Sequence, residues 1–260
     1  MKKPTLKEIR QKADAMAPRE AYDWLLELSE EFGDSVRKIA DKYYKKLETE
    51  NRERERLRTM MAIEDEARGK GYCYIGGVDE AGRGPLAGPV VAACVILPKD
   101  VMIYGLNDSK KLSPAKRDKL YDEIREKALA YGIGIADHNY IDRVNILNAT
   151  KKAMETAILS MKIKPDFLII DAVRLDLDIE QLSVPRADAT SASVAAASIL
   201  AKVTRDRIME KMDLKYPGYG FAQHKGYGTQ AHVEAIKRLG LCPIHRRSFT
   251  AGILDAETAV

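Results

Sequence analysis

The spacing of hydrophobic positions changes near residues 69–72 and divides the chain into two regions. In residues 5–67 the hydrophobic positions recur at helical spacing, with almost none of the alternation that is typical of strands. Ala17-Pro18 and Gly33-Asp34 interrupt this pattern, and proline and glycine commonly mark helix starts and ends. We therefore predict an all-helical N-terminal extension over residues 1–70.

The last helix of this extension is the longest, and Ser35 can cap its start. Its hydrophobic positions are Val36, Ile39, Tyr43, Leu47, Leu57 and Met60. Residues 48–58 are rich in charges of both signs, which is typical of a solvated helix face with local ion pairs. A contact with nucleic acid is the alternative interpretation of this run.

From residue 72 onward strand and helix patterns alternate, which predicts an α/β layered domain over residues 71–260. The predicted strands are Cys73–Asp79, Val90–Leu97, Ile133–His138 and Phe167–Asp171. The predicted helices are Ser113–Tyr131, Leu147–Met161, Ser191–Met212 and Thr229–Leu239. The second strand is apolar throughout, so we expect both of its faces to be covered.

Composition narrows the class of protein only slightly. A net charge of +4 is compatible with a polyanionic partner but too small to indicate one. No apolar run approaches the roughly 20 residues that cross a bilayer, and the charged start does not look like a secretory signal. The three cysteines lack the paired spacing of a zinc site or a disulfide framework. We expect a cytoplasmic, monomeric protein without membrane contact.

Acidic residues stand where two of the predicted strands end. Asp79 and Glu80 close the first strand and are followed at once by a glycine-rich stretch, and Asp171 closes the fourth strand. Asp188 lies just before a predicted helix that is rich in small residues. If the strands are neighbours, these four carboxylates can converge in one cleft.

Carboxylates that share a cleft need cations between them. Two of them about 5 Å apart repel by roughly 3 kcal/mol at an effective dielectric constant of about 20. Oxygen ligands without Cys or His at metal-ligand spacing suit Mg2+ or Mn2+, and two such ions about 4 Å apart can hold the attacking water and the leaving oxygen of a phosphodiester. The pattern predicts metal-dependent phosphoryl transfer. In the alternative interpretation each acid is a surface or capping residue, and for Asp188 a helix cap competes directly.

The stretch Asp79–Pro89, Asp-Glu-Ala-Gly-Arg-Gly-Pro-Leu-Ala-Gly-Pro, resembles the signature of the ribonuclease HII family. Six further blocks resemble family motifs in family order, and all seven together cover about residues 72–250. The six are Asn107–Leu112, Asn145–Leu147, Ala195–Arg207, Tyr216–Phe221, His224–Tyr227 and His245–Phe249. One glycine-rich match can arise by chance, whereas seven ordered matches do not.

This resemblance implies a ribonuclease H-like fold, a mixed sheet flanked by helices, with Asp79, Glu80, Asp171 and Asp188 as catalytic metal ligands. It implies an endoribonuclease that hydrolyses the RNA strand of RNA–DNA hybrids and nicks at ribonucleotides embedded in duplex DNA. Two divalent ions, Mn2+ or Mg2+, are expected in the substrate complex, and the products carry a 5′-phosphate and a 3′-hydroxyl. A non-catalytic nucleic-acid-binding module is the alternative. A nucleotide hydrolase is not favoured, because no Gly-Lys-Ser/Thr follows the glycines.

Two details separate this chain from related patterns. Ribonuclease HIII usually has a lysine where Arg83 stands and a glutamate as its last acid, so both positions favour ribonuclease HII. Before the last acid, the ribonuclease HII family usually has Lys-Gly, whereas this chain has Arg186-Ala187. Glycine gives easy access to left-handed backbone conformations, so its loss bears on the placement of Asp188.

Selectivity for a ribonucleotide requires contacts to its 2′-hydroxyl. The stretch Gly82-Arg83-Gly84 suits this task, because glycines let the backbone approach a sugar and main-chain groups can pair with a hydroxyl. A tight turn between strands is the alternative. Tyr227 resembles the family tyrosine that packs beside the sugar next to the cut; otherwise it would be an ordinary core or surface residue.

Basic residues of the matching blocks are candidates for contacts to backbone phosphates. Lys110 and Lys111 are the principal ones, and the further candidates are Lys202, Arg205 and Arg247. The histidines His224, His232 and His245 match no metal motif, so we expect them to be structural or close to a phosphate.

Overall fold

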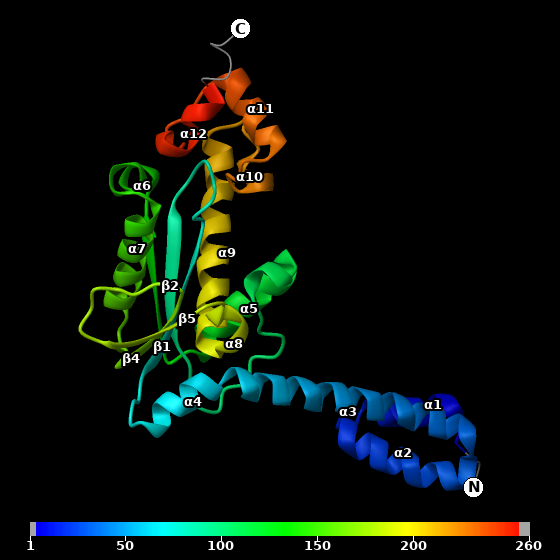
Figure 1. Ribbon diagram of the computed structural model, residues 1–260. Coiled ribbons are helices and arrows are strands. Elements are labelled where there is room, and N and C mark those ends of the chain that lie inside the picture. The colour runs from blue at the N-terminus through cyan, green and yellow to red at the C-terminus, as the bar shows by residue number, and fades with distance from the viewer. Residues whose placement is uncertain (1–3, 255–260) are drawn as a thin grey trace. The chain divides into compact units, whose positions relative to one another are not determined.

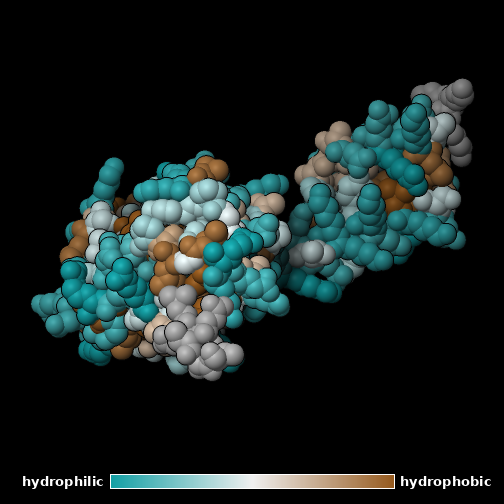
Figure 2. All heavy atoms as spheres, turned by 90° about the horizontal axis from the view of Figure 1, so that it is seen from above, coloured by the Kyte–Doolittle hydropathy of each residue, from teal (hydrophilic) through white to brown (hydrophobic). Residues whose placement is uncertain are grey.

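The computed structural model describes residues 4–254, and the chain divides into two compact units, Met1–Arg58 and Thr59–Val260. The division lies before residue 70, where the sequence pattern places the boundary, because the short helix α4 (Ala62–Gly69) belongs to the second unit. No helix in the described residues is both long enough and apolar enough to cross a membrane. On the face shown in Figure 2, hydrophilic side chains dominate and hydrophobic ones form small patches.

The first unit consists of helices, as predicted. They are α1 (Leu6–Asp14), α2 (Pro18–Phe32) and α3 (Asp34–Met60), of which α3 continues past Arg58. Pro18 opens α2 and Gly33 closes it at φ +70°, so both predicted interruptions are confirmed. Within the charged run of α3, arginines pair with glutamates three or four residues away, which supports the solvated helix face.

The second unit is built on a mixed five-stranded sheet (Figure 1). Its strands are β1 (Ile75–Ala81), β2 (Val90–Ile96), β3 (Ala130–Ala136), β4 (Phe167–Asp171) and β5 (Glu180–Val184). Their order is β3-β2-β1-β4-β5, with β2 antiparallel to both β1 and β3, and with β4 parallel to both β1 and β5. The order places β1 at the centre, beside β4, as convergence of the acids requires.

Helices cover both faces of this sheet (Figure 1). Those of the second unit are α4, the 3-10 helix η1 (Ser109–Lys111), α5 (Pro114–Lys127), α6 (His138–Val144), α7 (Ile146–Ser160), α8 (Ala187–Thr190), α9 (Ala192–Lys215), α10 (Phe221–His224), α11 (Gln230–Leu239) and α12 (Arg247–Leu254). On one face, α7 packs its alanines, Met154 and Ile158 against β1–β3. On the other, α9 lies so close to β1 that a Cβ at Gly77 would come within 2.2 Å of the Ser193 backbone.

Two predictions about elements were wrong. The helix predicted to reach Tyr131 ends at Lys127, and the strand that follows begins at Ala130 rather than Ile133. Residues 128–131 have good helix propensity, but pairing with β2 overrides it, because Ala130 lies opposite Ile96. The edge strand β5 was missed, since its residues are mostly exposed and show no hydrophobic alternation.

Candidate active site

The register of the sheet places two of the predicted acids side by side. Val78 of β1 pairs with Ile170 of β4, so the next residues, Asp79 and Asp171, follow on adjacent parallel strands. Side chains alternate along a strand, and Asp79 therefore shares the face of Gly77, which α9 covers. Asp79 is buried and is hydrogen bonded to the hydroxyl of Ser198 on α9.

Glu80 extends the acidic group past the end of this pair. Its Oε1 lies 3.5 Å from Nη1 of Arg83, whereas its Oε2 is buried and has no hydrogen-bond partner among residues 4–254. A buried carboxylate oxygen without a partner is costly in a folded protein. This oxygen is therefore available for a cation.

Asp188 lies on α8 and is also buried. The residue in the left-handed conformation is Arg186, with φ +58° and ψ +42°, and its N–H donates to Oδ1 of Asp171 at 2.8 Å. Ala187 opens α8 with ordinary helical geometry. The absence of glycine at position 187 therefore does not strain the backbone before Asp188.

The four carboxylates act on one another electrostatically. Burial raises the pKa of Asp79 well above its usual value, and the charge of Glu80 raises it further. Burial also raises the pKa of Glu80, opposed by Arg83 and reinforced by Asp171. Burial is also the main cause that raises the pKa of Asp188, followed by the charge of Asp108. Raised pKa values on neighbouring carboxyls indicate that negative charge there lacks compensation.

Lys110 on η1 is the cation that faces this group. Burial acts to lower its pKa, but carboxylates led by Asp188 and Asp79 raise it above the usual value. Asp108 belongs to the same acidic group, because its charge raises the pKa of Asp188. Its side chain accepts a hydrogen bond from the N–H of Lys110 at 2.8 Å. Asp108 was not among the predicted site residues, although the block Asn107–Leu112 contains it.

The donor set fits a hard divalent cation, because it consists of carboxylate oxygens and includes the unpartnered Oε2 of Glu80. Within residues 4–254 no three acidic, histidine or cysteine side chains lie close enough to enclose a metal ion as they stand.

The glycine-rich loop lies directly beyond these acids. Gly82 has φ +98°, and a Cβ there would come within 2.1 Å of Nε of Arg205. The carbonyls of Gly82 and Arg83 both accept from the buried guanidinium of Arg246, at 2.6 and 2.9 Å. In a trans peptide the N–H points opposite to the carbonyl, so the amides of Arg83 and Gly84 face away from Arg246.

Tyr227 lies beside this loop. A Cβ at Gly84 would be 3.9 Å from Cε1 of Tyr227, and the tyrosine side chain is 42% exposed. The two segments are joined at the backbone, because Leu86 N–H donates to Gly226 O at 2.8 Å. The structure thus brings Gly82-Arg83-Gly84 and Tyr227 next to each other.

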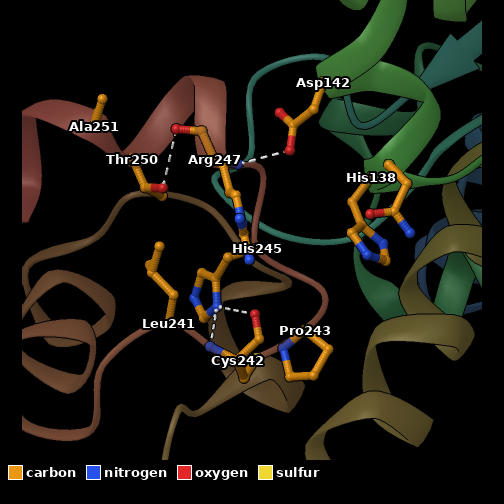
Figure 3. Close-up of a pocket in the computed structure, with 10 residues that line it drawn as sticks. His138, Asp142, Leu241, Cys242, Pro243, His245, Arg247, Thr250 and Ala251 are labelled. Carbon is orange, nitrogen blue, oxygen red and sulfur yellow. Dashed lines mark hydrogen bonds between the residues drawn. The ribbon is translucent and has the colours of Figure 1, made fainter.

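Not all of the candidate phosphate contacts are compatible with the structure. Arg205 is fully buried and donates to three carbonyls, so the prediction that it contacts phosphate is wrong. Lys202 is paired with Asp206 at 2.7 Å, whereas Lys111 is exposed on η1. Arg247 lines a cavity of about 850 Å³ between α6 and the C-terminal helix, and its N–H donates to Asp142 (Figure 3).

His224, His232 and His245 form a structural cluster, in which His232 and His245 are buried and His224 is half-buried. His224 and His232 stack with ring centroids 4.4 Å apart, and Nε2 of His232 lies 3.1 Å from Nε2 of His245. Burial lowers the pKa of His232 to about 4, so it is neutral at physiological pH. Their structural role was one of the two expected.

Comparisons with known proteins identify the family of this chain. A family model described as Ribonuclease HII matches residues 76–251. A ribonuclease HII from Acetivibrio thermocellus is 56% identical over 251 residues, which are 96% of this chain and 98% of that protein. One from Ruminiclostridium cellulolyticum is 53% identical over 252 residues, again 96% of this chain and 98% of that protein. The crystal structure of ribonuclease H2 from Pyrococcus horikoshii OT3 has a TM-score of 0.60 and 30% identity, covering 72% of this chain and 100% of that one.

Proposed function

Because this chain belongs to the ribonuclease HII family, we propose that it nicks duplex DNA at embedded ribonucleotides as well as cutting the RNA strand of RNA–DNA hybrids. The enzyme class itself is a metal-dependent ribonuclease. One observation carries the proposal about embedded ribonucleotides. Two amides that point away from Arg246 lie beside an exposed tyrosine, immediately past the end of the acid-bearing strand β1.

We assign the metal-holding role to Asp79, Glu80, Asp171 and Asp188. When two divalent ions, Mg2+ or Mn2+, are bound there, they supply charge for the phosphate and make a water more acidic. The unpartnered Oε2 of Glu80 and the mutually raised pKa values of Asp79 and Glu80 support this assignment. A histidine base is unnecessary, and the histidines of α10, α11 and the C-terminal segment are occupied in their own cluster.

The loop residues recognise the sugar in this proposal. The N–H groups of Arg83 and Gly84 donate hydrogen bonds to the oxygen of the 2′-hydroxyl. The carbonyls of Gly82 and Arg83 do not take part, because they already accept from Arg246. The ring of Tyr227 packs against the neighbouring sugar. Lys110 and Lys111 hold the backbone phosphates that pass over η1. The cut leaves a 5′-phosphate and a 3′-hydroxyl.

The test uses a labelled duplex that carries one ribonucleotide, a matched all-DNA duplex and a matched RNA–DNA hybrid. With Mg2+ or Mn2+ we expect one nick beside the ribonucleotide, multiple cuts in the hybrid and none in the all-DNA duplex. Cutting of the hybrid alone would overturn the claim about embedded ribonucleotides. Binding of all three without any cutting would instead favour a non-catalytic binding module.

A further inference from the structure

Two arginines of the second unit are buried without a carboxylate partner. Arg205 on α9 and Arg246 just before α12 are both 0% exposed, and within residues 4–254 neither forms an ion pair. Burial lowers the pKa of Arg246 to about 9 and that of Arg205 to about 10. A buried cation is costly unless hydrogen bonds compensate it, so the contacts of these two side chains indicate what they do.

The side chain of Arg246 donates all three of its hydrogen bonds to carbonyls of the loop after β1. Its Nη2 donates to Gly82 O at 2.6 Å, its Nη1 to Arg83 O at 2.9 Å and its Nε to Gly88 O at 2.9 Å. The loop is also tied to the C-terminal segment by the N–H of Arg246, which donates to Leu86 O at 2.8 Å. One side chain therefore fixes both ends of the loop.

Arg205 binds the rest of the loop and links it to the neighbouring turn. It donates to Ala87 O at 3.1 Å, to Pro89 O at 2.9 Å and to Lys225 O at 2.9 Å. Lys225 lies two residues before Tyr227 and has a left-handed backbone, with φ +53°. The guanidinium carbon of Arg205 is also 5.7 Å from the centroid of the Tyr227 ring. Arg205 therefore contacts both the loop after β1 and the ring of Tyr227.

We propose that Arg246 and Arg205 are positioning residues for ribonucleotide selectivity, which hold the amides of Arg83 and Gly84 and the ring of Tyr227 in one fixed arrangement. This inference rests on the proposed function, in which those groups contact the sugars. The guanidinium is a planar fork with donors in fixed directions, whereas a lysine ammonium is a point charge on a flexible stem. Lysine keeps the charge at either position and loses the geometry.

The experiment compares the full-length protein with Arg246→Lys and Arg205→Lys. Met154→Ala is the control, because Met154 is a buried core residue of α7, which covers the face of the sheet opposite to α9. Three quantities are measured for each: kcat and KM on the duplex with one ribonucleotide, and the inhibition constant of the matched all-DNA duplex. Circular dichroism and thermal unfolding give the folded fraction.

We expect Arg246→Lys to lower kcat/KM at least tenfold, mainly through a higher KM, while the inhibition constant of the all-DNA duplex changes less than twofold. Arg205→Lys should act in the same direction. Met154→Ala should lower only the active fraction and leave KM unchanged. Equal loss of affinity for both duplexes, an unchanged KM, or failure of both lysine variants to fold would each assign the arginines to general stability and overturn the proposal. If the wild type itself showed no preference for the ribonucleotide duplex, the proposed function would fail first.

Discussion

At the scale of single residues, the carboxylate of Asp79 is the group whose replacement most directly tests the site. We predict that Asp79→Asn lowers kcat by about a thousandfold or more, equivalent to about 4 kcal/mol, while duplex affinity stays the same. The amide preserves shape and removes the charge that would hold a cation. Single-turnover cleavage and fluorescence anisotropy measure the two quantities. Cleavage within tenfold of the wild type would remove Asp79 from the metal site.

Arg186 provides a second test at this scale. Its left-handed backbone costs a residue with a Cβ more than it costs glycine. We predict that Arg186→Gly raises the free energy of unfolding by about 1 kcal/mol, whereas Ala187→Gly lowers it because Ala187 is helical. Urea denaturation of both variants gives the comparison. The opposite order would mean that the left-handed residue is Ala187.

That Asp79 and Asp171 lie at the ends of neighbouring strands could be predicted from sequence, because a strand that ends on a carboxylate is a local signal. The roles of Asp108, Arg205 and Arg246 could not. Arg246 bonds to carbonyls 158 to 164 residues earlier in the chain, and no local pattern shows which side chain will reach them. The prediction for Arg205 failed for this reason, since an arginine on a helix is ordinarily exposed.

At the scale of elements, α4 stabilises the start of α9. Glu64 is fully buried, and its Oε1 accepts from the hydroxyl of Ser191 at 2.7 Å and from the N–H of Ser193 at 2.9 Å. A carboxylate at this position also interacts favourably with the helix dipole. This segment was predicted to belong to the N-terminal extension, because a short amphipathic helix carries no signal of what it packs against.

We predict that Glu64→Ala lowers the free energy of unfolding by about 2 kcal/mol, since it leaves two buried donors at the helix start without their acceptor. The matched control is Glu66→Ala on the same helix, which removes only an exposed pair with Lys70. Chemical denaturation should separate the two variants clearly. Equal effects would show that the buried hydrogen bonds do not matter.

The strand and helix alternation of the second unit was predictable, and the mixed sheet confirms it. The elements that were predicted wrongly or missed are strands that form because a neighbouring strand offers them hydrogen-bond partners. β3 begins earlier because β2 offers it a partner, and β5 exists because β4 does, with Glu180 opposite Phe167. Such strands are determined by their neighbours in the sheet.

At the scale of the whole molecule, the histidine cluster predicts how stability depends on pH. His232 has a pKa lowered from 6.5 to about 4 by burial, with His224 and His245 adding to the effect and the Tyr227 carbonyl opposing it. As the pH falls, His232 therefore binds a proton at a higher pH in the unfolded chain than in the folded protein. The contribution of His232 is fully present above pH 6.5 and is lost as the pH falls toward 4.

The measurement is the free energy of unfolding between pH 7 and 4 for the wild type and His232→Gln. We expect a smaller decline for the variant, because it lacks the titrating ring, whatever its stability at pH 7. Carboxylates lose their own contributions in both proteins, so the difference isolates the histidine. Parallel curves would show that His232 keeps its ordinary pKa when folded.

The position of the unit boundary leads to a prediction about truncation. Removing residues 1–58 leaves α4 and Glu64 in place, whereas removing residues 1–69 deletes them. We predict that the shorter truncation preserves the melting temperature of the second unit and that the longer one lowers it by several degrees. Calorimetry distinguishes them, and cleavage kinetics of the shorter truncation show what the first unit adds. The alignments with the two ribonucleases HII extend into that unit, since they cover 96% of this chain.

The bonds between Arg246 and the loop at Gly82 also set an order of events during synthesis. A chain leaving the ribosome presents its acids and its glycine-rich loop early, but the loop receives its guanidinium only when a residue 164 positions later has emerged. Contacts this distant in sequence form late. If the loop recognises the sugar as proposed, nascent chains carry an unfinished recognition surface until Arg246 has emerged.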